Sequence, residues 1–191
     1  KMKRIFSIFV LVLLLALGLF LAFAPAMLDE RENVVVEHQP YDISAQAQAL
    51  HSSLMVGDWH ADSLLWMRNL SEEYDYGHLD FPRMQRGNLG LQMFTTVTKS
   101  PSGQNYELNS SDASDNITLL VMAQRWPTVT WTSLAERALF QADKLHHLAA
   151  HDPDNLMLVR SRIDLAEFLQ RRQSNPTLIG GLLGTEGSHA L

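Results

Sequence analysis

The chain has 191 residues, enough for one mid-sized domain with a substantial hydrophobic core. Its net charge of -6 argues against nucleic-acid binding, which requires a basic surface. Because the sequence contains no cysteine, it excludes disulfides, thiolate zinc sites and cysteine nucleophiles. Any bound metal must therefore be held by His, Asp and Glu.

The first 28 residues predict a signal anchor in the cell membrane. Basic residues within positions 1–4 precede a charge-free run of 20 residues, 5–24, which as a helix would span about 30 Å. A cleaved signal peptide is an alternative, since "APA" at 24–26 resembles a cleavage site. A buried soluble helix is a third reading. The charge order, basic before the run and acidic at 29–32, predicts a single-pass protein whose domain is extracytoplasmic.

Residues 29–41 are polar, contain Pro40, and predict a linker before a domain at 42–191. Ser133 and Glu136 form a capping box that starts one of the predicted helices, and Ser161 with Asp164 repeats the signal. Apolar periodicity and these caps predict a helix at 42–53, strands at 54–56 and 89–97, a loop at 99–115, helices at 116–126, 133–151 and 161–172, and strands at 155–159 and from 178 onward.

Strands that alternate with helices predict an α/β fold with a parallel sheet. In such folds the functional site lies at the carboxyl ends of the strands. His60 and Asp62 follow the first predicted strand, and Glu186 lies at the end of the last one. We therefore expect these three side chains on the same rim of the sheet.

The spacing of His60 and Asp62 permits both side chains to reach one ion, because residues i and i+2 of an extended strand point to the same side. One nitrogen and one or more carboxylate oxygens suit zinc, and Glu186 could complete or bridge such a site. The His-x-Asp pattern alone is weak, however, since a solvated polar loop at a strand end has the same composition. The residues by themselves leave both readings open.

Four segments in order resemble the membrane (renal) dipeptidase family of zinc metallopeptidases. "GDWHADSLLWMRNL" is similar to its Asp-x-His-x-Asp opening, although Trp59 stands where glycine is frequent. "LIGGLLGTEGSHAL" at 178–191 resembles its Gly-x-Glu-Gly-x-His-x-Leu block, with Ser188 in place of a second glycine. "HLDFPRMQRGNLGLQMF" at 78–94 and "DNLMLVRSRIDL" at 154–165 resemble the two blocks between them.

The resemblance implies the N-terminal half of a (β/α)8 TIM-like barrel that, in the full-length protein, hydrolyses dipeptides with a hydroxide bridging two zinc ions. By motif position, His60 and Asp62 would bind the first zinc. Glu186 would be the catalytic carboxylate that bridges both ions. The second-zinc histidines would lie beyond residue 191, so we expect the sequence to be part of a longer protein. A dipeptide substrate, the membrane and a second copy in a homodimer are the expected partners.

Two further residues are expected to lie next to the ligands without binding the metal. Asp58 could orient His60 or cap a turn, and His189 could support a ligand or serve in packing. His78 and Asp80 are expected to be structural, and His146 and His147 to lie on a solvated helix face. Two alternatives to the dipeptidase remain open. One is another amidohydrolase-like hydrolase on the same barrel, because a fold does not fix the substrate. The other is a catalytically inactive, membrane-tethered fragment.

Overall fold

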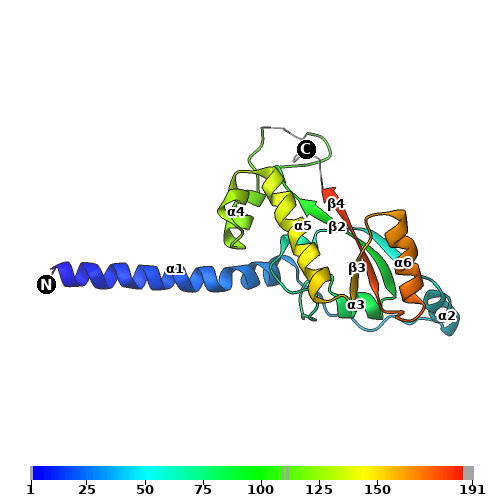
Figure 1. The fold of residues 1–191 in the computed structure, drawn as a ribbon. Coiled ribbons are helices and arrows are strands. Elements are labelled where there is room, and N and C mark those ends of the chain that lie inside the picture. The colour runs from blue at the N-terminus through cyan, green and yellow to red at the C-terminus, as the bar shows by residue number, and fades with distance from the viewer. Residues whose placement is uncertain (1, 109, 111, 187–191) are drawn as a thin grey trace.

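The computed structural model describes residues 2–108, 110 and 112–186. One long helix projects from an α/β domain (Figure 1). The elements in chain order are α1 (Met2–Glu32), α2 (Ala45–Ser53), β1 (Val56–Ala61), η1 (Ser63–Leu65), α3 (Phe81–Arg86), β2 (Leu89–Val97), α4 (Ile117–Ala123), η2 (Thr128–Trp131), α5 (Leu134–His151), β3 (Leu156–Leu158), α6 (Arg162–Arg172) and β4 (Ile179–Glu186).

The four strands form one parallel sheet, as predicted, in the order β1-β2-β4-β3. A (β/α)8 barrel places its strands in chain order, so the position of β4 between β2 and β3 differs from the expected half-barrel. Strand β3 has only three residues and pairs with the first residues of β4, Ile179–Gly181. The described strands make an open sheet, and its closure into a barrel stays a prediction.

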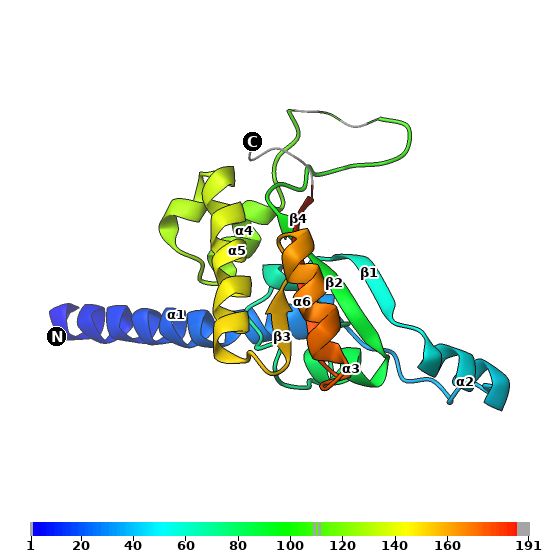
Figure 2. The same cartoon turned by 45° about the vertical axis from the view of Figure 1, so that its right-hand side comes forward.

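The sheet is covered on both faces. Phe94 of β2 packs in one core cluster with Leu145 of α5, and Leu91 packs on the opposite face against Phe168 of α6. Turning the molecule shows α6 crossing in front of the strands (Figure 2). A Cβ at Gly180 would lie 2.7 Å from Leu91 Cδ2 and 3.1 Å from the Phe168 ring, so glycine permits this close approach of α6.

The local capping signals are confirmed. Ser133 accepts a hydrogen bond from the main-chain N–H of Glu136, and Ser161 accepts one from Asp164. The predicted strand at 89–97 is β2. Helix α3 was not predicted, because six residues are too few to show an amphipathic period. Its N-cap Asp80 accepts from the Arg83 main-chain N–H at 2.8 Å and from Arg83 Nε at 2.6 Å, which confirms a structural role for Asp80.

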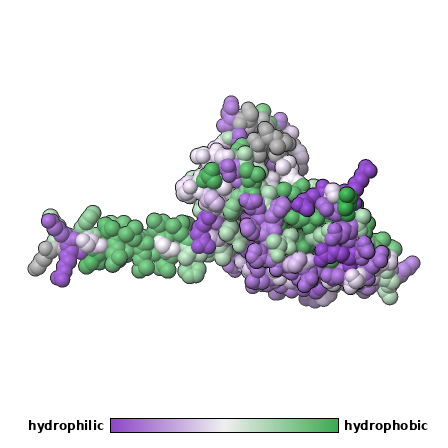
Figure 3. Space-filling view, viewed as in Figure 1, coloured by the Kyte–Doolittle hydropathy of each residue, from purple (hydrophilic) through white to green (hydrophobic). Residues whose placement is uncertain are grey.

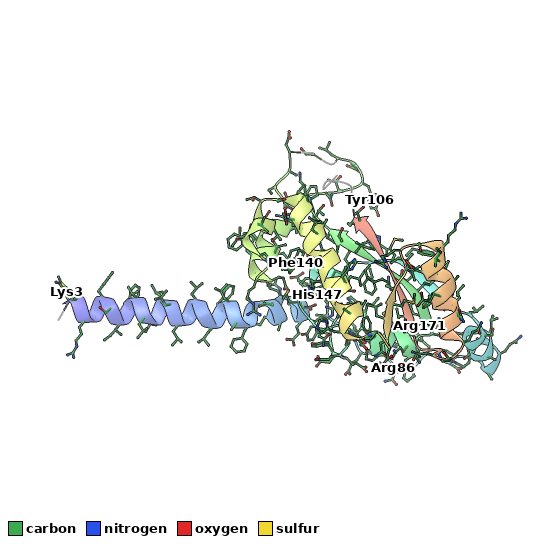
Figure 4. All side chains as sticks on the ribbon, in the orientation of Figure 1. Lys3, Arg86, Tyr106, Phe140, His147 and Arg171 are labelled. Carbon is green, nitrogen blue, oxygen red and sulfur yellow. The ribbon has the colours of Figure 1, made fainter. Side chains whose placement is uncertain are left out.

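Helix α1 is longer than its apolar run. It is the one helix among the described residues that is long and apolar enough to cross a membrane. Its surface is apolar along most of its length (Figure 3), with Lys3 at its free end (Figure 4). Residues 29–32, expected to be linker, continue the helix, and the extended segment begins after Asn33. Asp29 is buried against the domain rather than solvated.

Candidate metal centre

The first strand was predicted too early in the chain: β1 begins at Val56, runs to Ala61 and includes His60, whereas residues 54 and 55 lie outside it. Its pairing with β2 is irregular: Asp58 lies opposite Gln92, but Ala61 lies opposite Phe94, so β1 has one extra residue in this stretch. Such a bulge re-aims the side chains that follow it. Asp62 then leaves the strand, and its carbonyl accepts from the Leu65 N–H at 3.0 Å to begin the 3-10 turn η1.

The structure brings the three predicted ligands together. His60 Nε2 lies 2.8 Å from Glu186 Oε2 and 3.5 Å from Asp62 Oδ1. One ligand atom from each of the three residues lies within 4.8 Å of the others. Tetrahedral ligands held about 2.1 Å from one zinc ion would be roughly 3.4 Å apart. The side chains remain 56%, 39% and 44% exposed for His60, Asp62 and Glu186, so the cluster is open to a ligand.

Neighbouring groups hold two of these residues. The Thr95 hydroxyl on β2 donates a hydrogen bond to Asp62 Oδ1, the same carboxylate oxygen that faces His60, and so orients this carboxylate. Asp58 Oδ1 accepts from the main-chain N–H of His60 at 3.2 Å. Asp58 therefore contacts the backbone of His60 and not its ring. His189 lies outside the described residues.

Two hollows flank the cluster, and Asp62 lines both. One, of about 290 Å³, is also lined by His60, Asp58 and His78, together with Asn33, the residue that follows α1. The other, of about 310 Å³, is lined by three groups of residues: Asp62 and Glu186, the apolar Leu65, Val97 and Ile117, and Lys99, Ser100 and Gln104 of the loop after β2. Sequence reasoning placed neither Asn33 nor the loop 99–104 beside the ligands, since no local pattern marks them.

Polar side chains of α5 fix the end of β2 next to the cluster. Gln141 is fully buried, accepts at Oε1 from the Val97 N–H at 3.1 Å, and donates from Nε2 to the Val97 carbonyl at 2.9 Å. Arg137 Nη1 donates to the Thr98 carbonyl at 2.8 Å and to Asp115 Oδ2 at 2.6 Å. These contacts clamp both ends of the loop 99–115 that borders the second hollow.

Arg137 is 1% exposed, and every nitrogen of its guanidinium has a partner. Besides the contacts above, it donates to the carbonyls of Thr130 and Trp131 and to the Thr118 hydroxyl. Burial alone would raise the pKa of Asp115. Hydrogen bonds from Arg137 and from the main chain outweigh it, so the pKa of Asp115 is lowered from its ordinary value.

Lys144, one turn further along α5, supports the turn that follows Asp62. Its ammonium group donates to the carbonyl of Leu64 at 2.6 Å and to that of Trp66. Burial, reinforced by the charge of Arg68, lowers the pKa of Lys144 to about 7. A half-buried lysine that holds two carbonyls is a structural element of the site's wall.

Within residues 2–108, 110 and 112–186, no other three His, Asp or Glu side chains cluster closely enough to hold a metal. His146 and His147 are exposed on α5, as predicted, and His147 projects from the helix surface (Figure 4). His78 lines the first hollow but is not part of the ligand cluster. The donor set His60, Asp62 and Glu186 supplies one nitrogen and carboxylate oxygens, which fits zinc.

The His, Asp and Glu side chains converge at the strand ends of a parallel α/β domain. Folds of this class place their catalytic groups in this position, so the chain has the architecture of a metal-dependent α/β enzyme. The chain matches the family model of membrane dipeptidase, peptidase family M19, over residues 44–191. It therefore belongs to this family, whose members are metallopeptidases that act on dipeptides. No curated protein matches the sequence.

Proposed function

We propose that the protein is a zinc-dependent dipeptidase, held at a membrane by α1 with its domain on the extracytoplasmic side. The observation that carries the proposal is the convergence of His60, Asp62 and Glu186, which come from β1, its following turn and β4. Family membership supports the reaction class. The apolar run of α1 and the charges on either side of it support the location.

In this proposal His60 and Asp62 would bind the first zinc ion. Glu186 would bind both this ion and a second zinc ion. Glu186 presents Oε2 to His60, and a carboxylate has a second oxygen that can bind another ion. Bound zinc lowers the pKa of water and polarises a carbonyl. The chain's own residues hold these ions in place: Thr95 orients Asp62 through its hydroxyl, and Asp58 fixes the backbone of His60.

The second hollow is the proposed place for the dipeptide, because it opens directly onto Asp62 and Glu186. Leu65, Val97 and Ile117 form an apolar wall there that would exclude water from one side of the scissile bond. Ser100 and Gln104 offer hydrogen-bonding groups from the other side. The barrel that would complete the site is part of the same proposal and rests on the parallel strands β1, β2 and β4.

The test is metal analysis of the purified full-length protein, followed by assays on free dipeptides and on the same dipeptides with a blocked carboxyl group. We expect zinc to copurify and free dipeptides to be hydrolysed in a zinc-dependent manner. Bound zinc with hydrolysis of other amides but not of dipeptides would instead favour a different amidohydrolase. A protein that retains no zinc after dialysis against micromolar zinc would contradict the proposal.

A further inference from the structure

The end of α1 is joined to the domain by buried polar contacts. Asp29 Oδ1 lies 2.5 Å from Arg68 Nη1, and the two side chains are only 2% and 3% exposed. Asn33 donates from Nδ2 to the same Asp29 oxygen at 2.8 Å, and its main-chain carbonyl accepts from the Gly77 N–H at 2.7 Å. A buried, hydrogen-bonded ion pair fixes the orientation of its partners, because breaking it leaves an uncompensated charge.

A second contact binds the same helix to the same part of the domain. Gln124, at the end of α4, is fully buried. It donates from Nε2 to the Pro25 carbonyl at 3.1 Å and accepts at Oε1 from the Met67 N–H at 3.0 Å. One amide group therefore joins α1 to the segment that contains Met67 and Arg68.

This segment, residues 63–68, directly follows the candidate ligand Asp62. The domain and α1 both hold it: Lys144 of α5 binds the carbonyls of Leu64 and Trp66, and Gln124 at the end of α4 accepts from the Met67 N–H. Asp29 of α1 pairs with Arg68. Since Asp62 forms the first residue of the η1 turn, its position depends on how this segment is held. Asn33 also lines the hollow that contains His60 and Asp62.

We propose that residues 25–33 at the end of α1 are a positioning element of the metal centre. They hold the segment 63–68, and through it Asp62, in the geometry that the ligand cluster requires. The end of α1 then contributes to the structure of the metal centre, in addition to holding the protein at a membrane. Because α1 runs without a break from its apolar part to Glu32, it also fixes the distance of the site from a bilayer that the helix crosses. The metal-dependent part of this inference rests on the proposed function.

The first test replaces residues 34–40, which are all exposed, by a protease recognition sequence in the full-length protein. After cleavage in detergent, we expect α1 to stay bound, so that helix and domain elute together in gel filtration. Separation of the two pieces under these conditions would overturn the inference. This result does not depend on any metal, so it is distinct from the outcome of the proposed function.

The second test removes the ion pair between α1 and the segment 63–68 without leaving a buried charge. The double variant Asp29→Leu with Arg68→Met replaces a buried ion pair by apolar side chains, an exchange that proteins frequently tolerate. We expect a folded protein whose Co²⁺ affinity is reduced by about 10-fold, as for other groups that orient metal ligands. The Co²⁺ absorption spectrum should change as well, because Asp62 moves.

The matched control is Glu73→Leu with Arg86→Met, which removes an exposed ion pair of 2.6 Å that does not touch α1. We expect wild-type Co²⁺ affinity and spectrum from this control. Wild-type affinity and spectrum in the folded Asp29/Arg68 variant would overturn the inference. If that variant does not fold, the cleavage experiment, which alters no buried residue, decides whether α1 is a fixed part of the domain. A wild-type protein that binds no Co²⁺ would refute the proposed function, while the cleavage experiment would still decide the role of α1.

Discussion

His60 Nε2 lies 2.8 Å from Glu186 Oε2, although the strands that carry them, β1 and β4, are not neighbours in the sheet. Strand β2 lies between them, so the two side chains reach towards each other across about two strand spacings, roughly 9.6 Å. Thr95 is the residue of β2 that contacts Asp62 in this place. A strand that supplies no candidate ligand thus contributes a side chain that holds one of the three.

The ligand assignment predicts that Asp62→Ala lowers metal occupancy and dipeptidase activity together, because one of the coordinating oxygens is lost. The measurement is zinc content by atomic absorption, alongside turnover of a dipeptide at saturating zinc. Asp75→Ala is the control, since Asp75 is an exposed carboxylate of a neighbouring loop. Unchanged zinc content in the Asp62 variant would show that Asp62 is not a ligand.

Thr95→Val keeps the shape of the side chain but removes the hydroxyl that holds Asp62. We expect zinc affinity to fall by about 10-fold, with little change in the unfolding midpoint, because the group acts on a ligand's orientation. Thr95→Ser restores the hydroxyl and should recover most of the affinity. Equal affinities for the valine and serine variants would contradict this role.

Arg137→Met is expected to destabilise the domain by about 3 to 5 kcal/mol, because it leaves the Asp115 carboxylate without its buried cation. Urea denaturation measures this loss. Arg160→Met removes an exposed ion pair of 3.7 Å with Asp164 and should cost no more than about 0.5 kcal/mol. Similar losses for the two variants would show that the buried network contributes little.

The lowered pKa of Lys144 predicts that the free energy of unfolding rises with pH above neutrality. Its pKa is about 7 in the folded protein and about 10.4 in an unfolded chain, so between these values the unfolded state binds one more proton. Raising the pH from 7 to 9 should therefore stabilise the wild-type protein relative to Lys144→Met. Urea midpoints at pH 7, 8 and 9 measure the difference. Parallel pH dependences of the two proteins would contradict the lowered pKa.

The sequence was sufficient where short-range signals decide the structure. Ser133 and Ser161 start their helices through contacts three residues away, and β2 is rich in strand-forming residues towards its end. The convergence of the three candidate ligands followed from a topological rule: parallel strands end at one edge of the sheet. Their individual roles as ligands stay predictions.

The contacts that support the site were not predictable, because they join segments distant in the sequence. Arg137 and Gln141 lie among the apolar residues of α5, where hydrophobic periodicity counts only Leu134, Ala138, Leu145 and Leu148. Their hydrogen bonds to the end of β2 form only because the fold places that strand end next to α5. Likewise, the composition of 29–32 is that of a solvated linker, and only the position of Arg68 explains why Asp29 is buried and helical.

X-ray diffraction measured on both sides of the zinc absorption edge shows directly whether His60, Asp62 and Glu186 bind zinc. Crystals of the zinc-loaded full-length protein should show an anomalous peak about 2.0 to 2.2 Å from His60 Nε2 and from a carboxylate oxygen of both Asp62 and Glu186. An anomalous map with zinc bound elsewhere in the protein and no peak among these three side chains would contradict the account.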